Sequence, residues 1–180
     1  MNTKKMILSS LFIGMGLILP TIFHTVNLSG SIFSPMHLPV MIGGFLLGPL
    51  YGAIIGFITP VLSSVLTGMP PLMPIMPMMA LELLGYGFMC GLLFKVTKKI
   101  YISLILSIVF GRLCSMLGAF ILSLTLAPQI SPIPYVVSGV VNGLPGIAIQ
   151  LIVVPTLVKF MVTNKETIRV FSNESTLRMR

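Results

Sequence analysis

The sequence carries very little charge, and most of that charge is positive. It contains no aspartate and three glutamates, against eleven lysines and arginines, in 180 residues. Between Lys5 and Lys95 the one charged residue is Glu82. Water-facing surfaces need charges scattered throughout, so such a long stretch with one carboxylate excludes a soluble domain. A mean hydropathy of +1.08, with 56% apolar residues, indicates a polytopic membrane protein.

The basic residues predict the orientation of the chain. Ten of the eleven lie at 4–5, 95–99 and 159–180. Because cytoplasmic loops collect Lys and Arg, we expect all three clusters, and with them both termini, on the cytoplasmic side. The net charge of +8 is then a topology signal. It does not point to nucleic acid as a partner.

The apolar stretches predict the number of crossings. A hydrocarbon core of about 30 Å needs roughly 20 helical residues. We predict an all-α fold, a six-helix transmembrane bundle over residues 1–162, followed by a basic cytoplasmic tail over 163–180 that can lie against lipid headgroups. The predicted helices span 6–26, 38–48, 50–67, 77–95, 101–126 and 135–162.

The stretch 38–67 is too long for one crossing and short for two. If 4–5 and 95–99 are both inside, the number of crossings between them is even. Gly48-Pro49 is a suitable break, because proline stops a helix and glycine permits a reversal. We therefore expect two crossings here. A re-entrant loop is the alternative.

The predicted outer loops, 27–37, 68–76 and 127–134, carry no charge and are rich in Pro, Ser, Met and Gly. Such stiff, half-apolar loops suit folding over a cavity. The methionines around Met69 and Met73 could hold Cu(I) through their thioethers. Pro70 and Pro71 would interrupt the helix that such a pair needs, so we favour a deformable lid over an organic ligand.

Small residues recur every four positions. Gly44, Gly48, Gly52 and Gly56 form the longest series. Such stripes let membrane helices approach closely, and we expect most of them to serve packing within the bundle. Ser10 and Gly14 differ, because they lie on an otherwise bulky first helix near its cytoplasmic half. They suggest a docking site for another subunit, with packing inside the bundle as the alternative.

Few polar residues lie inside the apolar band, namely Glu82, Arg112, Asn142 and Gln150. Each charge there costs roughly 2.5–3.5 kcal/mol on insertion scales, so such residues normally face an interior or a cavity and serve function. Tyr86 lies one turn from Glu82 on the same helix face. The GLPG motif after Asn142 suggests a kink that lines a cavity. These groups predict a small-molecule pocket open to the outside. A purely structural pair of Glu82 and Arg112 is the alternative.

Catalysis and resident cofactors are not expected. No His, Cys or Glu cluster has metal-ligand spacing, and one Glu beside one Arg supplies neither a paired base nor a metal. No Gly-rich phosphate loop with lysine is present, so the chain does not bind ATP by a P-loop. Cys90 and Cys114 fall inside predicted helices and are interpreted as small buried hydrophobes.

The run SPMHLPVMIGGFLLGPLYGAIIGFITPVLSSVLTGMPPLMP, followed by MALELLGYG, resembles the substrate-binding S component of energy-coupling-factor (ECF) vitamin transporters. It is most similar to the pantothenate and B-vitamin carriers, and the likeness covers roughly 6–162. The resemblance implies a multi-pass protein of a prokaryotic plasma membrane that docks on a membrane coupling (T) component driven by two cytoplasmic ATPase subunits. It places the docking motif at Ser10 and Gly14. It places the ligand under the first and third outer loops, against Glu82, Tyr86, Arg112 and Asn142. His37, at the end of the first outer loop, completes the predicted substrate-binding set.

We therefore predict a substrate-capture subunit for a small water-soluble vitamin or precursor. Pantothenate is the first choice, since Arg112 would meet its carboxylate. A neutral vitamin such as pyridoxine is an alternative. A stand-alone proton-coupled secondary transporter acting through Glu82, and a non-transporting membrane scaffold, are the alternatives of other classes.

Overall fold

The chain folds into helices. The computed structural model describes residues 3–25, 33–125 and 131–163, and no strand occurs in these ranges. Five of the helices are long and apolar enough to cross a membrane, and a shorter apolar one spans His37–Leu47. The predicted all-α fold is therefore confirmed for the described part of the chain. The predicted tail beyond residue 163 and the loop segments 27–32 and 127–130 lie outside it.

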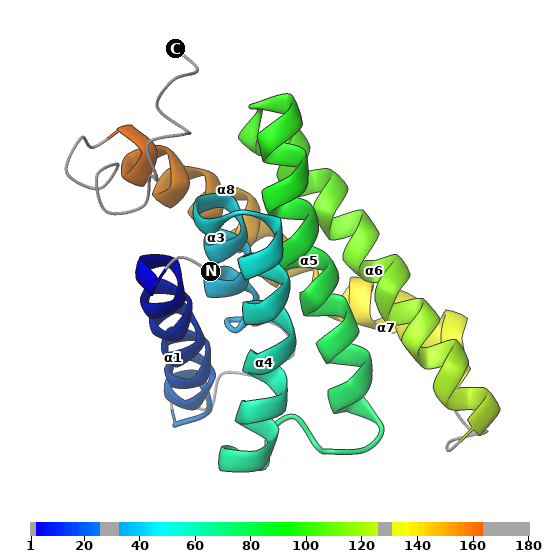
Figure 1. Cartoon of the computed structure of the whole chain (residues 1–180). Helices are drawn as coiled ribbons and strands as arrows, with labels where there is room; N and C mark the ends of the chain where they lie inside the picture. The colour runs from blue at the N-terminus through cyan, green and yellow to red at the C-terminus, as the bar shows by residue number, and fades with distance from the viewer. Residues whose placement is uncertain (1–2, 26–32, 126–130, 164–180) are drawn as a thin grey trace.

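Figure 1 shows the arrangement of the helices around one short helix, with the last two helices of the chain crossing behind the others. Their bounds are α1 (Thr3–Thr25), α3 (His37–Leu47), α4 (Pro49–Thr67), α5 (Ile75–Thr97), α6 (Ile100–Thr125), α7 (Pro132–Asn142) and α8 (Leu144–Thr163).

The break between α3 and α4 falls at Gly48. Its φ of +96° suits glycine, and Pro49 begins the next helix. The 11 residues of α3 span only about 16 Å of helix, roughly half of a hydrocarbon core. Whether this pair crosses twice or is re-entrant therefore stays a prediction.

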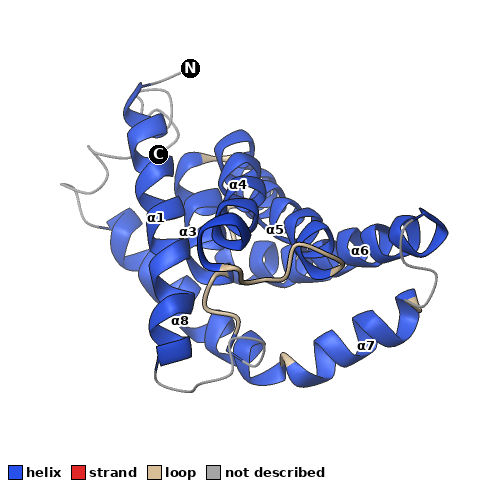
Figure 2. Ribbon diagram, turned by 90° about the horizontal axis from the view of Figure 1, so that it is seen from below, coloured by secondary structure: helices blue, strands red, loops and turns tan. Residues whose placement is uncertain are grey.

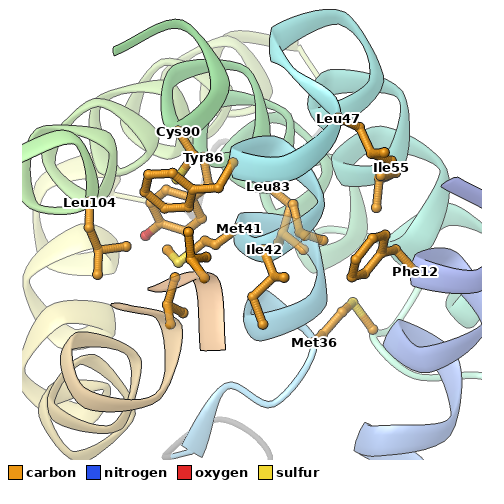
Figure 3. Packing of buried hydrophobic residues seen from close by; sticks show 14 of the residues in the cluster. Phe12, Met36, Met41, Ile42, Leu47, Ile55, Leu83, Tyr86, Cys90 and Leu104 are labelled. Atoms are coloured by element: carbon orange, nitrogen blue, oxygen red, sulfur yellow. The ribbon is translucent and has the colours of Figure 1, made fainter. Parts of the chain in front are cut away.

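The centre of the bundle is α3. It packs against α1, α4, α5 and α8, and nine of its eleven residues are buried. Figure 3 shows its Met41 and Ile42 among side chains of the neighbouring helices. A Cβ added at Gly43 would lie 2.7 Å from Cδ1 of Ile55 and 3.4 Å from Cγ of Phe12. The glycine thus lets α1 and α4 close on α3.

The glycine stripes are contact surfaces between helices. A Cβ at Gly44 or Gly52 would overlap the carbonyl of Gly87 on α5, and one at Gly56 would overlap the carbonyl of Leu83. Their regular spacing therefore brings the backbones of α3 and α4 against α5, as expected for small residues in membrane bundles.

The predicted single helix over 135–162 is two helices. The first of them, α7, ends at Asn142, and the N–H of Gly143 donates a hydrogen bond to the carbonyl of Gly139 at 3.1 Å. Pro145, in the first turn of α8, has no N–H with which to continue the earlier helix. From this break α7 lies beside α6, whereas α8 crosses behind α3 (Figure 1).

The described lysines gather at one end of the bundle. Nζ of Lys5 donates to the carbonyl of Leu47 at 3.1 Å and lies 5.6 Å from the ring centroid of Tyr51, so α1 begins beside the α3–α4 turn. The last residues of α5 and α8 lie toward the same upper end in Figure 1. Figure 2, seen from below, shows the α4–α5 loop in front of the opposite ends and α7 at the edge of the molecule.

Candidate ligand-binding site

The polar centre of the molecule is the buried carboxylate of Glu82 on α5. Its Oε1 accepts a hydrogen bond from the Tyr86 hydroxyl at 2.7 Å and lies 2.9 Å from Nη1 of Arg112. Nε2 of His37 lies 3.6 Å from the same oxygen. The structure thus brings together four of the five predicted substrate-binding residues. They come from α3, α5 and α6.

The positions of Glu82 and Tyr86 follow from the helix period. Residues four apart share one face, so both side chains point from α5 toward α3 and α6. Figure 3 shows Tyr86 beside the buried side chains of the central cluster. Its ring centroid lies 5.3 Å from that of His37, the first residue of α3. The position of the imidazole is therefore set by the start of α3 and by its contact with the Tyr86 ring.

Arg112 reaches Glu82 because Gly111 precedes it. A Cβ at Gly111 would overlap the Tyr86 ring and lie 3.0 Å from the Glu82 carbonyl. The missing side chain lets α6 approach α5 closely, which brings the guanidinium to the carboxylate.

Two glycines of the α7 segment line the other side of Arg112. A Cβ at Gly139 would lie 3.2 Å from Nη1 and one at Gly143 would lie 3.3 Å from Nη2. Both gaps are tighter than ordinary contact, so these positions leave room for the guanidinium. The sequence showed the four-residue spacing of this pair but not its partner.

Three buried polar atoms have no hydrogen-bond partner among the described residues. They are Nδ1 of His37, Nε of Arg112 and Oγ of Ser115. Leaving such a group unpaired costs about 1–3 kcal/mol. Two of the three belong to the Glu82 cluster, and Ser115 lies one turn from Arg112 on α6. A lone serine in an apolar helix gives no signal of such a position in the sequence.

Asn142 is not part of this cluster. It is the last residue of α7, its side chain is exposed, and its amide makes no hydrogen bond to the described residues. Its neighbour in sequence, Gly143, does lie against Arg112. The helix break therefore brings the backbone, rather than the Asn142 side chain, to the cluster.

The family of the chain follows from comparison with known proteins. The family model described as "ECF transporter, substrate-specific component" matches residues 4–158. The chain belongs to this family. The match extends from the start of α1 into α8 and includes every residue of the Glu82 cluster. No curated protein and no solved structure matches the chain.

As a member of this family, the chain is a multi-pass membrane protein and the substrate-binding subunit of a transport system. ECF substrate-specific components work with a membrane T component and ATPases, and theirs is not an enzyme family. The resemblance to the S component is thereby confirmed at the level of the family.

The first helix of this S component has two unlike faces. Ser9, Phe12 and Gly16 are buried against the bundle. Ser10 is exposed, with its hydroxyl bonded to the carbonyl of Met6 in its own helix at 3.1 Å. A Cβ at Gly14 would meet nothing within 4 Å. The predicted docking pair thus lies on the outward face.

The α4–α5 loop of the S component is tied to the end of α4. Oγ of Ser63 donates to the carbonyl of Met69 at 2.7 Å, and Oγ of Ser64 donates to that of Pro70 at 2.6 Å. Met69, Leu72 and Met73 farther along are exposed. The loop is therefore held at its start and presents apolar side chains.

A groove of about 640 Å³ lies between α6 and α7 of the S component. It is lined by Leu113, Met116, Leu117, Phe120, Pro132 and Ile133. All of these side chains are apolar, and none belongs to the Glu82 cluster. A water-soluble ligand finds no polar contact there, so the Glu82 cluster is the candidate site.

Proposed function

We propose that the chain is the substrate-capture subunit of an ATP-driven ECF importer in the plasma membrane of a prokaryote. It binds a small water-soluble vitamin or vitamin precursor from the outer side and delivers it inward with a T component and two ATPase subunits. The observation that carries this proposal is the buried cluster of Glu82, Tyr86, Arg112 and His37, with its unpaired polar atoms. Charges inside the membrane are costly and are normally kept for binding or transport.

The distribution of lysines supports the proposed orientation. The described clusters at the start of α1 and the end of α5 lie toward one end of the bundle, as does the end of α8, the helix that carries Lys159 (Figure 1). By the positive-inside rule this end faces the cytoplasm. The α4–α5 loop at the opposite end then faces outward and acts as a lid over the site, with its methionines as deformable contacts.

Pantothenate is the ligand that the sequence favours, because it offers a carboxylate to Arg112 together with hydroxyls and an amide. In the structure Nη1 of Arg112 already lies 2.9 Å from Glu82. A carboxylate ligand would therefore compete with Glu82 for the guanidinium. Asn142, at the end of α7, is the fifth proposed contact and would reach the ligand only from the rim of the site.

The proposed docking surface is the outward face of α1 around Ser10 and Gly14. Small side chains allow a partner helix to approach closely, and no other part of the described chain covers this pair. The T component is the proposed partner at this face. ATP hydrolysis by the attached ATPases then reorients the S component within the bilayer.

Reconstitution tests the proposed function. The chain is placed in proteoliposomes with the T component and both ATPase subunits of its host, and uptake of a labelled vitamin mixture is followed. We expect uptake that requires all subunits and ATP. Uptake by the chain alone, driven by a proton gradient, would favour the secondary transporter. Binding without any uptake would count against the importer.

A further inference from the structure

The charges of the candidate site cancel one another. Glu82 is the one charged residue between Lys5 and Lys95, and Arg112 is the one between Lys99 and Lys159. These two lie 2.9 Å apart, with 6% and 18% of their side chains exposed. The charges of the carboxylate and the guanidinium therefore cancel one another.

We infer that the ligand of this site is an electrically neutral molecule bearing hydroxyl, amide or ring-nitrogen groups. The inference rests on the proposed function, because it concerns the ligand of the proposed capture site. It deepens that proposal by naming the charge class of the ligand, and it replaces pantothenate, which carries a carboxylate, with a neutral vitamin or precursor.

An anionic ligand meets an arginine that is already paired with Glu82. To bind the guanidinium of Arg112, its carboxylate must approach Glu82 as well or displace it. Approach brings two like charges together in a low-dielectric site, and displacement leaves the buried Glu82 carboxylate without its main partner. The hydroxyl of Tyr86 adds a second donor that holds Oε1 of Glu82 in place. Both routes disfavour a carboxylate. A cationic ligand is also disfavoured, because the carboxylate of Glu82 that would bind it is already neutralised by Arg112.

A neutral polar ligand fits the groups that remain. Nε of Arg112 is a donor and Nδ1 of His37 is a donor or an acceptor, and both are buried without partners in the described chain. The hydroxyl of Ser115, one turn along α6, is a third such group. Hydroxyl, amide and ring-nitrogen groups can pair with these atoms while the Glu82–Arg112 pair stays closed.

Matched pairs of probes test the charge class directly. The purified protein in detergent is dialysed at pH 7.5 against equal concentrations of nicotinamide and nicotinate, panthenol and pantothenate, and pyridoxine and 4-pyridoxate. The amount of each that is retained is measured by mass spectrometry. Within each pair the skeleton is shared and the carboxylate is the main difference. We expect a neutral member to be retained at least ten-fold over its carboxylate partner.

The variant Glu82→Gln tests the cause of that preference. It frees the guanidinium of Arg112, so the retention ratio of the neutral member to the carboxylate member should fall at least ten-fold. Glu166→Gln changes the net charge of the chain equally and should leave the ratio unchanged. The comparison on the wild-type protein needs no variant and decides the matter if Glu82→Gln does not fold.

The inference is overturned if a carboxylate member is retained equally or better, if no member of any pair is retained, or if a folded Glu82→Gln protein keeps the wild-type ratio. Its failure is distinct from failure of the importer. Retention of a neutral probe without ATP-dependent uptake would contradict only the proposal that the chain belongs to an importer. ATP-dependent uptake of a carboxylate would contradict only the inference that the ligand is neutral.

Discussion

At the scale of single residues, one oxygen joins three helices. Oε1 of Glu82 is approached by groups from α3, α5 and α6. A buried ion pair is a weak source of stability, yet removing one partner is costly because the other charge is left buried and unpaired. The pair therefore contributes more to the placement of the three helices than to the free energy of unfolding.

The first prediction concerns this pair. Arg112→Leu should destabilise the detergent-solubilised protein by about 3–5 kcal/mol, because it leaves Glu82 unpaired. The double variant Arg112→Leu with Glu82→Leu should recover most of the loss and should no longer bind ligand. Melting temperature and equilibrium ligand binding are measured for both single variants and the double variant.

Lys95→Leu, which removes an exposed cation from the end of α5, is the control and should melt like the wild type. If the double variant binds ligand with unchanged affinity, neither Glu82 nor Arg112 belongs to the ligand-binding site.

The second prediction concerns the glycine that places Arg112. A methyl group at Gly111 would overlap the buried ring of Tyr86. Gly111→Ala should therefore cost about 1–3 kcal/mol of stability, as overpacking does, and should weaken ligand binding by moving α6. Gly14→Ala is the matched control, since its added methyl meets open space. Equal melting temperatures for the two variants would contradict the close approach of α6 to α5.

At the scale of elements, α1 and the α7–α8 break show how small residues direct helices. On α1 one small residue, Gly16, faces inward, where its added Cβ would lie 2.5 Å from Cγ2 of Thr59. Ser10 and Gly14 face outward. Of these positions on one helix, Gly16 packs against the bundle, whereas Ser10 and Gly14 form the proposed docking surface and are not covered by the described part of the chain.

The third prediction tests the outward contact. Ser10→Leu or Gly14→Leu should abolish ATP-dependent uptake in the reconstituted importer while changing ligand binding by less than about two-fold, because the added bulk blocks a partner helix and lies away from the Glu82 cluster. Ser138→Leu makes the same change at an exposed serine of α7 and should keep uptake. Parallel loss of binding and uptake in the α1 variants would argue against a docking surface.

At the scale of the whole molecule, the positions of the basic residues relate the bundle to the membrane. Because α5 ends and α6 begins around Lys98 and Lys99, the α4–α5 loop lies at the other end of α5. One orientation then assigns a side of the membrane to every loop.

The fourth prediction tests that orientation. In a chain with Cys90 and Cys114 replaced by alanine, single cysteines at Gly30, Leu72 and Gln129 should react with an impermeant thiol reagent added to intact cells. A cysteine at Lys98 should react only after the cells are opened, because Lys98 lies in the predicted cytoplasmic turn. Labelling is read as a mass shift of the purified protein. Reaction of the Lys98 cysteine in intact cells would reverse the assignment.

The sequence by itself determined that the chain is helical and membrane-embedded, because the near absence of charge and the long apolar runs are properties of composition and order. It also pointed to Glu82, Tyr86 and Arg112, since burial cost makes a polar residue in an apolar run conspicuous wherever the helix lies. His37 entered the predicted set from its place at the end of the first outer loop. Resemblance in residues 35–91 indicated the family that the family model then showed.

The tertiary structure alone decided what these residues contact. Pairing of Glu82 with Arg112 depends on the close approach of α5 and α6 at Gly111, and exclusion of Asn142 depends on where α7 ends. The single helix predicted over 135–162 was wrong, because the glycine and proline of GLPG break it at Gly143 and two helices diverge from there. Contacts between helices depend on distances across the bundle, and spacing along the chain does not contain those distances.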